Sequence, residues 1–74
     1  LLGEGHLAQA EGELREALSL APNNPQTPRI LVALGRVAAA RKQGAEATGY
    51  FTRALALDPT ESEARQALAQ LSRN

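Results

Sequence analysis

Residues 44–59 read GAEATGYFTRALALDP, a pattern that predicts one short amphipathic helix between a glycine turn and an Asp-Pro stop. A fainter copy of this stretch lies earlier, between Gly5 and Pro22. The matching pairs, each 37 residues apart, are Ala10 with Ala47, Leu14 with Phe51, Ala17 with Ala54, Leu18 with Leu55, Leu20 with Leu57, and Pro22 with Pro59. A unit that recurs at this length is typical of a helical solenoid, in which each repeat packs on the next.

Composition limits both the size and the chemistry of the protein. The chain has 74 residues, which is room for one small domain, and no cysteine, so it forms neither a disulfide nor a thiolate metal site. Its eight basic and eight acidic residues cancel, which argues against a generic binder of polyanions. The first 24 residues are acidic and residues 25–53 are basic, a distribution that suits stacking between neighbouring repeats or an acidic partner.

The sequence contains no obvious membrane or targeting segment. No apolar run approaches the roughly 20 residues that a membrane span needs, so we expect no membrane insertion. No signal peptide is visible either. Because Leu1 looks like the inside of a helix, we expect the chain to be a piece of a longer protein, and the cellular compartment stays open.

Apolar spacing predicts four helices, at about residues 6–20, 27–42, 45–57 and 60–72. We expect Thr27 to cap the second helix with Pro28 at its first position, and Lys42 to lie in its last turn with Arg41. The third helix should turn six residues inward: Ala47, Tyr50, Phe51, Ala54, Leu55 and Leu57.

Two further local signals complete the prediction of the helix ends. Gly44 should stop the second helix. Thr60 to Glu63 reads as a capping box, in which the Thr60 hydroxyl bonds the Glu63 amide at the start of the fourth helix.

The second and fourth helices also match each other, at a spacing of 34 residues, so that Leu34 aligns with Leu68. At this point the chain resembles the tetratricopeptide repeat, a helix–turn–helix unit of about 34 residues. The residues that carry the resemblance are Leu31, Leu34, Gly35 and Ala38 in the first-type helix, and Ala47, Phe51, Ala54 and Pro59 in the second-type helix. The unit between Pro22 and Pro59 is three residues too long for the family, and we place the extra residues in the connector from Asn23 to Pro28.

The resemblance implies an all-α fold of antiparallel helix-turn-helix repeats, stacked as an α-solenoid. Residues 1–24 would be the second helix of a partial repeat, residues 25–59 a complete repeat, and residues 60–74 a C-terminal capping helix. Small residues such as Gly35 and Ala47 would let the helices approach closely, while Leu34 and Phe51 fill the spaces between them.

Nothing in the sequence supports an enzyme, and we expect no cofactor. His6 is the only histidine, and it lies beside a turn glycine. The serines lack the setting of a nucleophile, and no phosphate-binding glycine loop is present. Nucleic-acid binding is also disfavoured, because the only aromatic residues, Tyr50 and Phe51, are expected on the core side.

In the tetratricopeptide family the first-type helices line a concave groove that binds peptides, so the resemblance implies a protein-interaction module. The residues placed in that groove are Arg29, Val32, Ala33, Arg36 and Ala40 from the second helix, and Gln66, Gln70 and Arg73 from the fourth. Their arginines suit an extended, mildly acidic segment of a protein partner. The alternatives are that they are simply solvated, and that the chain is a structural C-terminal cap of a longer array.

The first helix lacks a first-type helix of its own repeat. We therefore expect part of its face formed by Leu7, Leu14 and Leu18 to be uncovered, and exposed apolar patches drive association. The sequence thus predicts that the isolated chain forms a homo-oligomer through this face.

Overall fold

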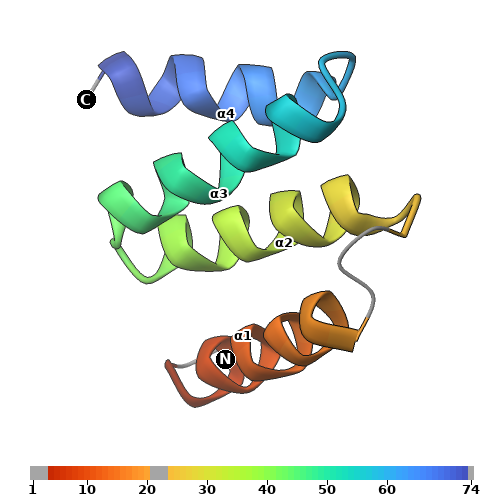
Figure 1. The fold of residues 1–74 in the computed structure, drawn as a ribbon. Coiled ribbons are helices and arrows are strands. Elements are labelled where there is room, and N and C mark those ends of the chain that lie inside the picture. Colours follow the sequence, from red (N-terminus) through yellow and green to blue (C-terminus); the bar gives the residue numbers. More distant parts are fainter. Residues whose placement is uncertain (1–3, 21–23, 74) are drawn as a thin grey trace.

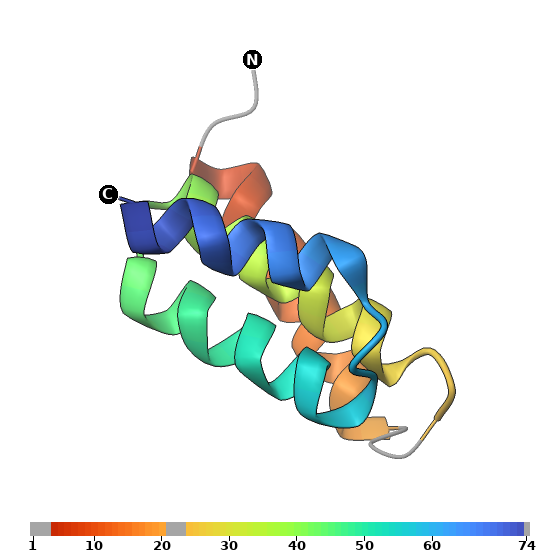
Figure 2. The ribbon, with the colours of Figure 1, turned by 90° about the horizontal axis from the view of Figure 1, so that it is seen from above.

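The computed structural model describes residues 4–20 and 24–73. In these ranges the chain forms four α-helices and no strand: α1 (Glu4–Leu20), α2 (Thr27–Ala40), α3 (Gly44–Leu57) and α4 (Ser62–Arg73). Each helix runs antiparallel to the one before it (Figure 1). In the view from above the helices overlap, and their axes run along roughly the same line (Figure 2). The predicted fold class, an all-α stack of about four helices, is confirmed.

The core lies where α2 and α3 pack against each other. Phe51, Leu31 and Leu34 are its largest fully buried side chains, and burial of each contributes about 1.5–3 kcal/mol relative to exposure. The remaining buried apolar residues are Val32, Ala38, Ala47, Ala54 and Ala64. Because Ala64 belongs to α4, the last helix also closes over this core.

One contact sets how closely α2 and α3 approach. A Cβ atom placed on Gly35 would lie 2.6 Å from Cε1 of Phe51, which is closer than real Cβ contacts. Only glycine lets the Phe51 ring lie against the α2 backbone without displacement. The expected thin crossing point is therefore present at Gly35.

The prediction that Leu57 points inward is wrong, since 55% of its surface is exposed. Ala47, Phe51 and Ala54 form the buried stripe of α3, and Leu57 falls to the side of this stripe. Tyr50, seven residues earlier, lies on the same side but is half-buried. Leu20, the repeat equivalent of Leu57, is 80% exposed.

The start of α2 also differs from the prediction, because Thr27 is not the N-cap. Gln26 occupies that position without a side-chain cap, and Thr27 is a buried residue of the first turn. Asn24 organises the turn instead. Its side-chain Oδ1 accepts a hydrogen bond from the Gln26 amide at 2.8 Å, and its carbonyl accepts one from the Thr27 amide at 2.9 Å.

At its other end α2 stops at Ala40, two residues before the predicted end at Lys42. Lys42 adopts the left-handed conformation, with φ of 62°. The Gln43 amide donates to the Ala38 carbonyl at 2.8 Å and the Lys42 amide to the Ala39 carbonyl at 3.0 Å, the bonding pattern of a Schellman motif. Gly44 therefore does not stop α2, because it is already the first residue of α3.

The predicted capping box before α4 is wrong as well. The Thr60 hydroxyl donates to Oδ1 of Asp58 at 2.6 Å, and the Thr60 amide donates to the same oxygen at 3.0 Å. Asp58 thus closes the turn after α3 by itself. The helix begins two residues later than Thr60, and the Glu63 side chain is turned towards α2 instead.

Candidate functional site

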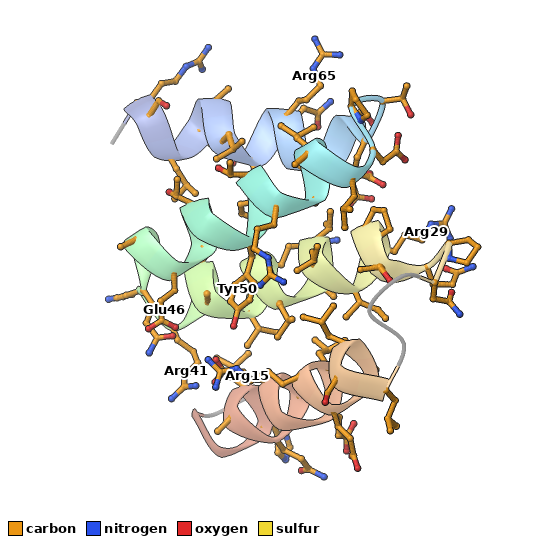
Figure 3. The ribbon with its side chains drawn as sticks, viewed as in Figure 1. Arg15, Arg29, Arg41, Glu46, Tyr50 and Arg65 are labelled. Atoms are coloured by element: carbon orange, nitrogen blue, oxygen red, sulfur yellow. The ribbon has the colours of Figure 1, made fainter. Side chains whose placement is uncertain are left out.

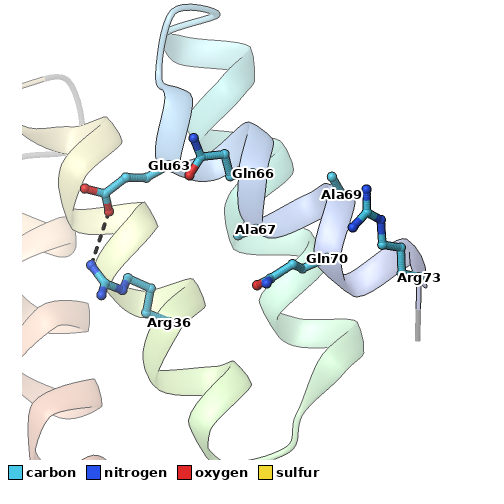
Figure 4. A pocket seen from close by; sticks show the side chains of 7 residues that line it. All are labelled: Arg36, Glu63, Gln66, Ala67, Ala69, Gln70 and Arg73. Atoms are coloured by element: carbon cyan, nitrogen blue, oxygen red, sulfur yellow. Dashed lines mark hydrogen bonds and ion pairs between the residues drawn. The ribbon is translucent and has the colours of Figure 1, made fainter.

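Helices α2 and α4 present one shared polar face, and two adjoining hollows lie along it. The first, of about 520 Å³, is lined by Arg29, Val32, Ala33, Arg36, Glu61 and Glu63. The second, of about 640 Å³, is lined by Arg36, Glu63, Gln66, Ala67, Ala69, Gln70 and Arg73 (Figure 4). Both hollows share Arg36 and Glu63, so we treat them as one surface, the α2–α4 groove.

Helical periodicity explains why these side chains gather. Arg29 and Arg36 are seven residues apart, with Val32 and Ala33 between them, which places them on one face of α2. Glu63 and Gln70 are related in the same way on α4. Val32 is buried and Ala33 half-buried, so they form the floor of the first hollow while the arginines form its rim.

Seven of the eight residues that the sequence analysis placed in the groove line these two hollows, namely Arg29, Val32, Ala33, Arg36, Gln66, Gln70 and Arg73. Ala40 lines neither of them, although it is exposed. Their role in binding stays a prediction.

Four further lining residues were missed: Glu61, Glu63, Ala67 and Ala69. Glu63 could have been found from its spacing, because it lies three residues before Gln66 on the same helical face. Glu63 was not placed in the groove because the sequence analysis had assigned it to a capping box.

An ion pair bridges the groove at its middle. Nη1 of Arg36 lies 3.2 Å from Oε2 of Glu63, so the pair joins α2 to α4 (Figure 4). The two side chains are 71% and 59% exposed, and such a pair contributes at most about 1 kcal/mol to stability. Arg36 is therefore already neutralised by Glu63, whereas Arg29 and Arg73 form no ion pair with the described residues.

A second polar cluster attaches α1 to the rest of the stack. Glu11 forms ion pairs with Arg41 and, at 3.5 Å, with Arg15. Nε of Arg15 donates to the Tyr50 hydroxyl at 3.3 Å, and the two side chains point toward each other in Figure 3. The hydrogen bond to the Tyr50 hydroxyl, and then the nearby negative charge of Glu11, hold the pKa of the Arg15 guanidinium above its usual value.

Leu7, Leu14 and Leu18, the residues of the predicted self-association face, are all half-buried. Leu18 packs against the core. Ala10, Glu11 and Ala17 are the other half-buried residues of α1, and they lie on the same side. The exposed remainder of α1 is largely polar, so the described structure leaves only part of each of these leucines open to a second copy.

Other kinds of site find little support in the residues that the structure describes. His6 is exposed. Residues 4–20 and 24–73 contain no group of three or more histidine or acidic side chains that could hold a metal ion. No helix in these ranges has the length and apolar character needed to cross a membrane.

Comparison with known proteins identifies two similar nematode proteins. The chain is 39% identical over 61 residues to "Protein adenylyltransferase fic-1" of Caenorhabditis briggsae, and 38% identical over 61 residues to the protein of the same name from Caenorhabditis elegans. In both cases the match covers 82% of this chain and 11% of the relative, so the chain spans about a tenth of the length of these relatives. No solved structure matches at a significant level.

The sequence profile of one family covers almost the whole chain. The tetratricopeptide repeat profile matches residues 1–71, and the antiparallel helix stack and the glycine contact at Gly35 are what such a repeat needs for close helix packing. The chain therefore belongs to the tetratricopeptide repeat family.

Proposed function

We propose that this chain is a non-catalytic interaction module that binds a segment of a partner protein along the α2–α4 groove. Tetratricopeptide repeats generally mediate protein–protein interaction, which supports a role as an interaction module. The observation that carries the choice of surface is the groove itself, because two hollows that share Arg36 and Glu63 adjoin there between α2 and α4.

The charges of the groove favour an extended partner segment with separated acidic residues. Arg29 lines one hollow and Arg73 the other, and neither is neutralised by a described residue. Arg36 between them is paired with Glu63. Carboxylates of the partner would therefore pair with the two outer arginines, while Gln66 and Gln70 donate and accept hydrogen bonds along the backbone between them.

The name of the similar nematode proteins describes an enzyme, but only about a tenth of their length matches this chain. We assign the matched repeat region of this chain to binding, since the family is typically non-catalytic. Any chemistry would belong to other parts of a larger protein.

The experiment compares two charge-reversed variants of the chain. One carries Arg29→Glu together with Arg73→Glu, and the control carries Arg65→Glu, which reverses a charge of α4 that lines neither hollow of the groove. Partners captured from a lysate are identified by mass spectrometry, and the affinity of the purified partner is then measured by calorimetry. We expect the groove variant to bind the partner at least about tenfold more weakly. Each of the two partner carboxylates loses its arginine and faces a glutamate of like charge instead.

The control variant should bind within about twofold of the unmodified chain. Equal binding by all three proteins would contradict the groove proposal. The chain would then be better explained as a structural cap of a longer repeat array.

A further inference from the structure

A third hollow lies on another part of the surface, where α1, the first residue of α2 and α3 meet. It has a volume of about 320 Å³ and is lined by Leu18, Thr27, Arg53, Ala56 and Leu57. None of these residues lines the α2–α4 groove. We call it the α1–α3 hollow.

The stripe of α3 that turns toward α1 explains how this hollow arises. Tyr50, Arg53 and Leu57 follow one another at helical spacing on this stripe. Tyr50 meets α1 directly through its hydrogen bond with Arg15 (Figure 3). Two turns further along α3, Leu57 is left 55% exposed, and the space between it and Leu18 stays open.

The lining of the hollow combines apolar walls with a single charge. Leu18, Ala56 and Leu57 supply aliphatic surface, and Arg53 is the only ionisable residue among the five. Among the residues that the structure describes, the Arg53 side chain forms no ion pair or hydrogen bond. An exposed large aliphatic side chain next to an unpaired guanidinium is complementary to a ligand that carries an apolar group beside an anion.

We propose that the α1–α3 hollow is a second docking site, which takes a partner-protein segment with one large apolar side chain next to a carboxylate. The apolar side chain enters the hollow against Leu18 and Leu57, and the carboxylate pairs with Arg53. The volume is at the lower end of ligand pockets, which suits one inserted side chain. This site is independent of the groove and would let the module hold two segments at once.

A second copy of the chain fits the hollow less well than a partner segment. In a symmetric dimer the same patch meets itself, so two Arg53 cations would approach each other without a facing acid in the lining. A stable dimer also buries about 1,200–2,000 Å² in total, far more surface than five residues around one hollow provide.

Three capped tetrapeptides test the proposal: Ac-Gly-Phe-Asp-Gly-NH2, its Phe-Asn analogue and its Ala-Asp analogue. Each is titrated at millimolar concentrations into the 74-residue chain and followed by amide-resolved NMR. We expect the Phe-Asp peptide to shift the amides of Leu18, Ala56 and Leu57. The Asn analogue should bind about threefold more weakly, because it loses the charge pair, and the Ala analogue at least about tenfold more weakly, because it loses the buried ring.

Variants at exposed positions make the test specific without endangering the fold. Arg53→Gln should make the Asp and Asn peptides bind alike, and Leu57→Ser should weaken both by about threefold or more. Arg36→Gln in the groove should leave all three affinities unchanged, which separates this site from the proposed groove function.

Four outcomes would overturn the proposal. They are no shift with the Phe-Asp peptide, equal binding of the Asp and Asn peptides to the unmodified chain, shifts centred on α2–α4 groove residues, and shifts at the hollow that appear on concentration without peptide. The last result would show that a second copy occupies the hollow.

Discussion

Gly35 of α2 lies against the ring of Phe51 of α3 so closely that a Cβ atom at Gly35 would come within 2.6 Å of the ring. Phe51 is one of the largest fully buried side chains in the described chain, so this contact lies in the core between α2 and α3. Gly49, also in a helix, contrasts with it, because a Cβ atom there would meet nothing within 4 Å.

The first prediction concerns this pair of glycines. Gly35→Ala should destabilise the protein by about 1 kcal/mol net, since overpacking costs about 1–3 kcal/mol and the gain in helix propensity offsets about 1 kcal/mol. Gly49→Ala should stabilise by about 0.5–1 kcal/mol, because only the propensity gain applies. Urea unfolding followed by circular dichroism measures both, and equal effects of the two substitutions would refute the packing argument.

The second prediction concerns the turn between α2 and α3. Lys42 holds a left-handed conformation that costs a residue with a Cβ atom about 1 kcal/mol or more. Lys42→Gly should therefore raise the free energy of unfolding by roughly that amount, while Lys42→Val should lower it, since a β-branched residue fits this region worst. The check is again urea unfolding, and a stabilising valine would show that the turn has rearranged.

The third prediction concerns the attachment of α1. The ion pair of Glu11 and Arg41 is mostly shielded from water, with side-chain exposures of 14% and 22%. Glu11→Gln should weaken this ion pair and lower the free energy of unfolding by about 1–2 kcal/mol. Hydrogen exchange should then speed up in α1 more than in α3. Glu13→Gln, at an exposed position of the same helix, should change neither the stability nor the hydrogen exchange of α1. An equal effect of Glu13→Gln and Glu11→Gln would show that net charge alone is responsible.

The fourth prediction concerns the pH dependence of the turn after α3. Hydrogen bonds from the hydroxyl and amide of Thr60 hold the pKa of the Asp58 carboxyl below its ordinary value. A carboxyl with a lowered folded-state pKa stabilises the fold above its unfolded pKa, and this contribution is lost as the pH falls through the folded pKa.

Thr60→Val should accordingly raise the pKa of Asp58 towards its ordinary value, as measured by an NMR titration of the carboxyl group. Thr52→Val, on the exposed side of α3, provides the matched control. An unchanged Asp58 pKa in the Thr60 variant would mean that another donor holds this carboxylate.

Local sequence determined the helices and the repeat. Apolar spacing, prolines and the 37-residue match were enough to place four helices, because these signals depend on residues close in the chain. The same signals failed at helix ends, where Asn24, Asp58 and Lys42 compete with the predicted caps through short-range hydrogen bonds. Several turn geometries are compatible with one sequence there, and packing selects among them.

Only the tertiary structure decided which side chains meet. Residues of α2 and α4 could be assigned to one face by periodicity. The pairing of Arg36 with Glu63, which neutralises Arg36, depends on how the two helices are placed. Leu57 is a clearer case. Its apolar character favoured burial, yet it is exposed and shares an open hollow with Leu18 of α1. No local pattern in α3 contains information on how α1 is placed.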